Sequence, residues 1–204
     1  SWSVMAKNLF PETIDKISNE LTPMVATARL IKQEHPDASV VFIGPCASKK
    51  LEASRRTVRS DVDFVITFEE LTGMFEAKGI LLDEIKAMDE MKDATAAGRG
   101  YGVAGGVANA IKECIEQYYP GTPVNIQHAE SLAECKKALL LAKAGKMNGC
   151  LIEGMACPGG CIAGAGTNIA IPVAARAVDK FKNEAEKKVP DESVDQEMVE
   201  LEKE

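Results

Sequence analysis

Short apolar runs alternate along the chain with longer segments that carry apolar residues at helical spacing. The runs predict strands and the longer segments predict helices. Thr22 and Pro23 suit the N-cap and first position of one helix, and Ser131 suits the N-cap of another. Gly79 and Gly145 suit helix ends. The predicted strands are 38–45, 62–68, 123–130 and 148–156. The predicted helices are 22–35, 69–79, 105–119, 131–146 and 170–188. A further helix is predicted to start at residue 83 and to be followed by a loop of small residues that reaches residue 100.

This alternation defines the predicted fold class. Apolar strands, such as the buried strand predicted at 38–45, joined by crossovers of helical length favour an α/β fold with a mainly parallel sheet flanked by helices. Ligands of such sheets bind at the loops beyond the carboxyl ends of strands. We expect one α/β lobe over residues 1–187 and an acidic tail at 188–204, either solvated or docked on a partner.

Composition and charge limit the classes of protein to which this chain can belong. The 204 residues are 46% hydrophobic, which is enough for a sizeable core. The net charge of −7 and the lack of a long basic run argue against nucleic acid or a membrane surface as the main partner. We expect no transmembrane helix, because no apolar run reaches 18 residues. The N-terminus lacks the charged and apolar parts of a signal peptide. A chain of this size can be stable without disulfides, so we expect reduced cysteines in the cytoplasm.

The six cysteines form two groups. Those in helical or apolar strand patterns are predicted to pack in the core: Cys114, Cys135 and Cys150. Cys46, Cys157 and Cys161 instead follow strands in loops rich in glycine and proline. Glycine lets a backbone approach a ligand closely, successive N–H groups attract anions, and thiolates hold iron–sulfur clusters. The loop "GMACPGGCIAGAG", residues 154–166, together with the distant Pro-Cys, therefore predicts an iron–sulfur cradle.

A cluster bound only by protein takes four cysteines, and three are well placed. The fourth ligand could come from Cys150, from a partner, or from a segment upstream of Ser1, where the sequence starts without Met. Two other interpretations stay open. The same three thiols could hold a structural zinc ion, and Cys157 and Cys161 could form a disulfide in an oxidised sample.

Two motifs resemble a known family. "GPCASKKLEA", residues 44–53, and "EGMACPGGCIAGAG", residues 153–166, are similar to two of the three signature motifs of iron-only (di-iron) hydrogenases. The stretches 61–80 and 101–111 resemble the segments between them, and the likeness runs from about Trp2 to about residue 170. Trp2 is similar to the last residue of the family's Cys-Cys-Pro-x-Trp motif. The resemblance implies a C-terminal fragment of the large subunit that lacks the first motif and its cysteines.

The resemblance implies a role for each matching residue. The metal ligands would be Cys46, Cys157 and Cys161, which would hold the 4Fe–4S cubane of an H-cluster, with Cys161 bridging to the di-iron subsite. Lys49 would hold a cyanide ligand, Met155 would pack over the subsite, and Glu52 and Ser18 would relay protons. Cofactor-binding positions would be Pro45, Gly105, Gly106, Gly159 and Gly160.

Without the resemblance these side chains have ordinary interpretations. Lys49 would be a solvated charge, Met155 a core residue, Glu52 an exposed helical carboxylate and Ser18 a cap. The two histidines, His35 and His128, are predicted to be surface residues outside any constellation.

The implied reaction is reversible reduction of protons to hydrogen, with electrons from a ferredoxin-like carrier. The chain alone is expected to be inactive and its cluster absent or incomplete, because the first motif would have to come from the missing N-terminal part. Two departures favour an alternative, a hydrogen-sensing or iron–sulfur-binding regulatory module. Gly44 stands where the family usually has Met, and Thr167 follows Gly164-Ala165-Gly166 where three glycines and a proline are usual.

Overall fold

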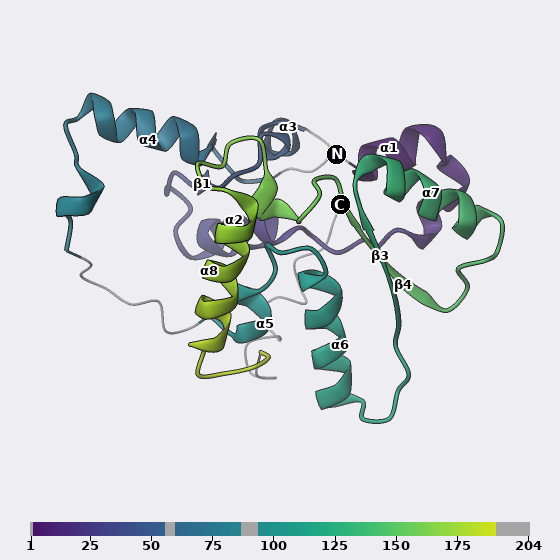
Figure 1. Cartoon of the computed structure of the whole chain (residues 1–204). Coiled ribbons are helices and arrows are strands. Elements are labelled where there is room, and N and C mark those ends of the chain that lie inside the picture. Colours follow the sequence, from purple (N-terminus) through teal and green to yellow (C-terminus); the bar gives the residue numbers. More distant parts are fainter. Residues whose placement is uncertain (1, 56–59, 87–93, 191–204) are drawn as a thin grey trace. The chain divides into compact units, whose positions relative to one another are not determined.

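The computed structural model describes residues 2–55, 60–86 and 94–190 (Figure 1). Its described residues divide into two compact units. The first unit consists of residues 2–18, 94–163 and 169–190, and the second consists of 19–55, 60–86 and 164–168. Most of the predicted acidic tail, residues 191–204, lies outside the described residues.

The first unit is built around a parallel pair of six-residue strands. Strands β3 (Asn125–Glu130) and β4 (Cys150–Met155) pair in register from Asn125↔Cys150 to Glu130↔Met155. Helix α7 (Leu132–Lys143) forms the crossover between them (Figure 1). The other elements are α1 (Trp2–Leu9), the 3₁₀ helix η1 (Pro11–Lys16), α5 (Ala96–Arg99), α6 (Gly106–Tyr118), the 3₁₀ helix η3 (Cys161–Ala163) and α8 (Ile171–Asn183).

Small residues allow close packing in the core of this unit. Ala129 and Cys135 are buried in one cluster, and Trp2 of α1 packs against it. Gly154, in β4, makes room for Trp2, since a Cβ built there would lie 3.1 Å from the Trp2 ring and 3.3 Å from Cys135 Sγ. Helix α1 is therefore fixed to the strand that leads into the predicted cysteine loop.

The second unit also contains one parallel pair of strands. Strands β1 (Val41–Ile43) and β2 (Phe64–Ile66) pair with Val41 opposite Phe64. The remaining elements are α2 (Pro23–Glu34), α3 (Ser48–Ser54), α4 (Phe68–Ala77) and the 3₁₀ helix η2 (Leu82–Glu84). The buried cluster is formed by Met24, Val25, Ala28 and Val62, with Phe42 and Val65 packed against it.

Most predicted elements are confirmed, and the strands pair in parallel as expected. The prediction of a buried strand at 38–45 is wrong for one of its faces. Phe42 packs on the core, whereas Val41 and Ile43, which point to the other side of the pleat, are 43% and 44% exposed. Period-2 exposure cannot be seen in a run where every residue is apolar. The short helices η1 and α3 were not predicted from the sequence.

The predicted N-cap residues can be compared with the caps in the structure. Ser131 accepts a hydrogen bond from the Glu134 N–H at 3.1 Å, so its predicted cap is confirmed. Thr22 occupies the N-cap position of α2 but makes no side-chain cap. Its hydroxyl instead donates to the carboxylate of Glu52, because an ionised acceptor competes well against a backbone partner.

In the described ranges, no helix has both the length and the apolar character that a bilayer crossing requires.

Candidate metal centre

The cysteine loop, residues 157–161, leaves the carboxyl end of β4 and ends where η3 begins. Neither thiol forms a disulfide; Cys157 is partly buried and Cys161 is exposed. Gly159 and Gly160 have φ values of 91° and 90°, a conformation that residues with a Cβ rarely adopt. The glycines therefore allow the sharp turn that brings the two cysteines onto one short loop.

A second loop, residues 102–104, fixes the cysteine loop by backbone contacts. Val103 forms an antiparallel bridge with Gly160, and the Ala104 N–H donates to the Gly159 carbonyl at 3.1 Å. A Cβ at Gly160 would lie 2.4 Å from the Ala104 nitrogen. At Gly160, the missing side chain thus makes room for protein backbone. The expected role of Gly160 in cofactor binding stays a prediction.

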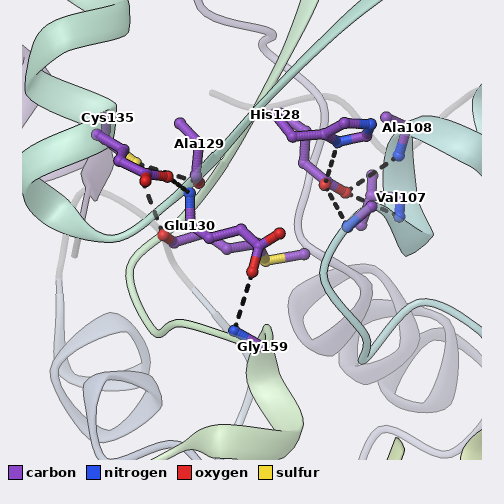
Figure 2. Close-up of polar contacts among 11 residues, drawn as sticks. Val107, Ala108, His128, Ala129, Glu130, Cys135 and Gly159 are labelled. Carbon is purple, nitrogen blue, oxygen red and sulfur yellow. Dashed lines mark hydrogen bonds and ion pairs between the residues drawn. The ribbon is translucent and has the colours of Figure 1, made fainter.

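Glu153 is a site residue that sequence reasoning missed. It lies in β4, is 8% exposed, and accepts three backbone hydrogen bonds at the start of α6 (Figure 2). The donors are Gly105 at 2.6 Å, Val107 at 3.0 Å and Ala108 at 3.1 Å. The first N–H groups of a helix have no partner within it, and their partial positive charge favours a carboxylate. The signal in the sequence was an acidic residue inside the apolar strand "CLIEGM".

His128 shares this carboxylate. Its Nδ1 lies 3.2 Å from Glu153 Oε2, and the two residues are directly paired across β3 and β4 (Figure 2). The side chain is 41% exposed, but the prediction that it stands outside any constellation is wrong. The register of two strands far apart in the sequence creates this pair, and spacing along the chain does not encode that register.

Gly105 and Gly106 have separate backbone partners. Gly105 caps α6 with a φ of 82°, and its N–H is held by Glu153. The Gly106 N–H donates to the Val103 carbonyl at 2.9 Å. A Cβ at Gly106 would lie 2.0 Å from the Gly100 carbonyl oxygen, so close backbone approach requires glycine there. Their expected role as donors to a cofactor is not tested by these contacts.

The other cysteines differ in burial. Cys135 is buried as predicted, with its Sγ 3.7 Å from the carbonyls of Ala129 and Met155, and burial raises its pKa. Cys114 packs at the edge of a buried cluster. Cys150 is only partly buried at the start of β4, where Asn125 donates to its Sγ at 3.2 Å, so the core prediction is wrong there.

The second unit holds the other predicted ligand, Cys46, just beyond the end of β1. This thiol is partly buried and free. The carbonyl of Pro45 accepts from the Gly166 N–H at 2.9 Å. A Cβ at Gly166 would lie 2.4 Å from Thr67 Cβ, so glycine lets residues 164–168 pack on this unit.

Charged side chains on α3 follow Cys46 directly. Lys49 Nζ lies 2.8 Å from Glu52 Oε2, and the two side chains are 20% and 24% exposed. The same carboxylate accepts the hydroxyl of Thr22. Glu52 is thus a half-buried helical carboxylate with two partners. Ser18 belongs to the first unit and is exposed, and Met155 is buried at the end of β4.

The donor set of the cysteine loop fits an iron–sulfur group. Cys157 and Cys161 offer two soft thiol ligands on a loop whose backbone is fixed at Gly159 and Gly160. Among the described residues, no group of three or more His, Cys, Asp or Glu side chains is arranged to hold a metal ion. Cys46 belongs to the second unit and the other two cysteines to the first.

These features define an α/β protein with cysteine thiols on strand-end loops, and its family is established by comparison. Residues 1–165 match the family model "Iron only hydrogenase large subunit, C-terminal domain". The chain belongs to this family. The family resemblance found in the sequence is therefore confirmed.

Two curated relatives show the range of this similarity. The periplasmic Fe hydrogenase large subunit of Nitratidesulfovibrio vulgaris is 27% identical over 221 aligned positions, and the alignment covers 88% of this chain and 52% of that protein. The cytosolic Fe-S cluster assembly factor NAR1 of Kluyveromyces lactis is 39% identical over 69 residues, 34% of this chain and 15% of that protein. This chain spans about half the length of the first relative. One relative is named as periplasmic and the other as cytosolic, so a cytoplasmic location stays a prediction.

A solved structure supports the fold. A single-residue variant of the FeFe-hydrogenase HydA1 from Chlamydomonas reinhardtii superposes with a TM-score of 0.75 at 20% identity, covering 98% of this chain and 69% of that one. This likeness confirms the predicted α/β fold class.

Proposed function

We propose that this chain supplies two of the three cluster-binding motifs of an iron-only hydrogenase. The observation that carries the proposal is the cysteine loop, which places two thiols outside any disulfide on a backbone fixed by glycine contacts. Cys157 and Cys161 are two thiolate ligands of a 4Fe–4S cluster. Cys46 is the third ligand on the resemblance of its motif alone. The activity of the whole protein is the reversible reduction of two protons by two electrons to hydrogen.

The bound group supplies the redox chemistry, and the chain's residues hold and surround it. Lys49 carries a positive charge that suits an anionic diatomic ligand. Glu52, with the Thr22 hydroxyl and the Lys49 ammonium as partners, can accept and release protons through hydrogen bonds, as can Ser18. Met155 provides an apolar, polarisable side chain. Pro45, Gly105, Gly106, Gly159 and Gly160 shape the binding loops. A ferredoxin-like protein is the proposed electron donor.

Anaerobic reconstitution with ferrous iron and sulfide tests the ligand assignment. We expect about four iron atoms per chain and a brown colour, with a small thiol from the buffer as the remaining ligand. Cys157→Ala and Cys161→Ala should each lose most of this iron. Cys150→Ala is the matched control, because Cys150 is also partly buried but lies at the opposite end of β4. Full iron uptake by Cys157→Ala would contradict the assignment, and a colourless protein that binds zinc would favour the structural zinc site.

Hydrogen evolution is a separate test. We expect none from this chain alone and measurable turnover from the matured whole protein. Hydrogen production by the isolated, cluster-loaded chain would show that the first motif is dispensable, which would contradict the proposed division of the site.

A second candidate is a sensory or regulatory iron–sulfur module, and Gly44 favours it. A Cβ at Gly44 would lie 2.9 Å from the ring of Phe42, which packs on the core of the second unit. A larger side chain, such as the Met usual in the family, would therefore require this ring to move. Rapid turnover by the whole protein would exclude a purely sensory role, whereas slow turnover with full cluster occupancy would favour it.

A further inference from the structure

We propose that Glu130 is a positioning residue of the cysteine loop that also makes the reduction potential of the bound group more negative. This inference rests on the proposed function, because it concerns the group held by Cys157 and Cys161. It adds a residue that lies in neither signature motif. Glu130 is the last residue of β3, and it pairs with Met155 in the parallel register.

The position of Glu130 follows from the fold around it. Because Met155 precedes Cys157 by two residues, the end of β3 lies beside the start of the cysteine loop. The Glu130 N–H donates to Glu134 Oε2 at 2.8 Å, so its backbone is tied to the first turn of α7. Ser131 caps the same turn. The side chain of Glu130 therefore extends from a backbone fixed on both sides.

The carboxylate of Glu130 contacts the loop between the two cysteines. Its Oε2 accepts the Gly159 N–H at 3.2 Å (Figure 2). The Gly159 carbonyl accepts from Ala104 at 3.1 Å, so the two backbone polar groups of this residue are held by opposite partners. Gly159 lies midway between Cys157 and Cys161, and holding it restrains the loop that carries both thiols.

The negative charge of Glu130 should also affect the reduction potential of the bound group. N–H groups that donate to cluster sulfurs, and the net charge nearby, set the reduction potential of iron–sulfur groups. The Gly159 N–H is engaged by a carboxylate and is thus withdrawn from the thiolates. The same carboxylate adds negative charge beside two anionic ligands. Both effects disfavour the addition of an electron.

Two substitutions separate restraint from charge. Glu130→Gln keeps an acceptor oxygen but removes the charge, whereas Glu130→Ala removes both. Glu134→Gln is the matched control, because it removes a charge one helical turn away, keeps an oxygen for the Glu130 N–H, and leaves the Gly159 contact unaltered.

The first measurement is hydrogen exchange of the Gly159 amide in the metal-free full chain, followed by NMR. Glu130→Ala should accelerate exchange roughly tenfold, Glu130→Gln less, and Glu134→Gln not at all. Unchanged exchange in Glu130→Ala would overturn the positioning role. This arm needs no bound iron.

The second measurement is the reduction potential of the anaerobically reconstituted chain, from a spectroscopic titration. Both Glu130 variants should shift the potential to more positive values, and Glu134→Gln should leave it close to that of the unaltered chain. An unshifted potential in Glu130→Gln with normal iron uptake would overturn the electrostatic role alone. Failure of the unaltered chain to take up iron would contradict the proposed function, and the electrostatic role with it.

Discussion

The two cysteine loops of this protein are held by different kinds of contact. In the first unit, the backbone of residues 157–161 is fixed by the backbone of residues 102–104 and by Glu130. In the second unit, Cys46 is followed by a short helix whose Lys49 and Glu52 form a half-buried ion pair. The contacts of the first loop therefore centre on its glycine backbone, whereas the helix after Cys46 carries a side-chain ion pair.

This difference predicts different tolerance to substitution. Backbone-to-backbone contact at Gly160 leaves no volume for a Cβ, and the cost of adding one cannot be relieved by a rotamer change. Removing one charge of a partly solvated ion pair changes the free energy of unfolding little, since water replaces the lost partner. We therefore expect a substitution at Gly160 to destabilise the first unit strongly, and substitutions at Lys49 or Glu52 to change the stability of the second unit little.

The largest effect is expected for Gly160→Ala. Its φ of 90° and the 2.4 Å approach of the Ala104 nitrogen should together lower the free energy of unfolding of the first unit by about 3 kcal/mol. Gly73→Ala in α4 is the matched control. A Cβ there meets nothing within 4 Å, so that variant should gain about 0.5–1 kcal/mol from helix propensity. Urea unfolding measures both, and an unaffected Gly160→Ala would refute the rigid-loop interpretation.

A smaller effect is expected when a carboxylate is neutralised in each unit. Glu153→Gln replaces a buried acceptor of three backbone N–H groups, so the free energy of unfolding should fall by about 2 kcal/mol. Glu52→Gln should cost less than about 1 kcal/mol, because Glu52 and Lys49 are both partly solvated. Chemical denaturation measures both variants. An equal loss of free energy of unfolding in the two would contradict the proposed difference between the units.

The smallest effect concerns pH and the second unit. The Lys50 ammonium, together with the Thr67 N–H, holds the pKa of Glu70 below its usual value. A lowered folded-state pKa stabilises the fold above the unfolded-state value near 4.5, and this contribution is lost as the pH falls through the lowered pKa. The thermal midpoint of the unaltered chain should therefore fall more steeply below pH 4.5 than that of Glu70→Gln. Parallel pH profiles would contradict this.

Local patterns were sufficient to predict most elements and the cysteine loops. Apolar runs identified the four strands of the described residues, and Ser131 and Gly79 correctly marked helix ends. Exposure was harder to predict, because "VVFI" gives no sign of which face of β1 is left open.

The carboxylate network could not be predicted from spacing. Glu153 and His128 meet only because β3 and β4 pair in one particular register, and Glu130 reaches Gly159 for the same reason. Thr22 was identified as a cap because capping is the usual role of threonine before Pro, and the competing carboxylate of Glu52 lies 30 residues away.

Trp2 gives the first unit its own optical reporter. It is the single tryptophan of the chain, and its ring is seated on Gly154 beside Cys135. Intrinsic fluorescence excited at the indole band will therefore follow the environment of β4, three residues before Cys157, and will not record the second unit directly. Far-ultraviolet circular dichroism follows helices of both units. Recording the two signals on one sample gives separate melting curves for the loop held by backbone and for the fold as a whole.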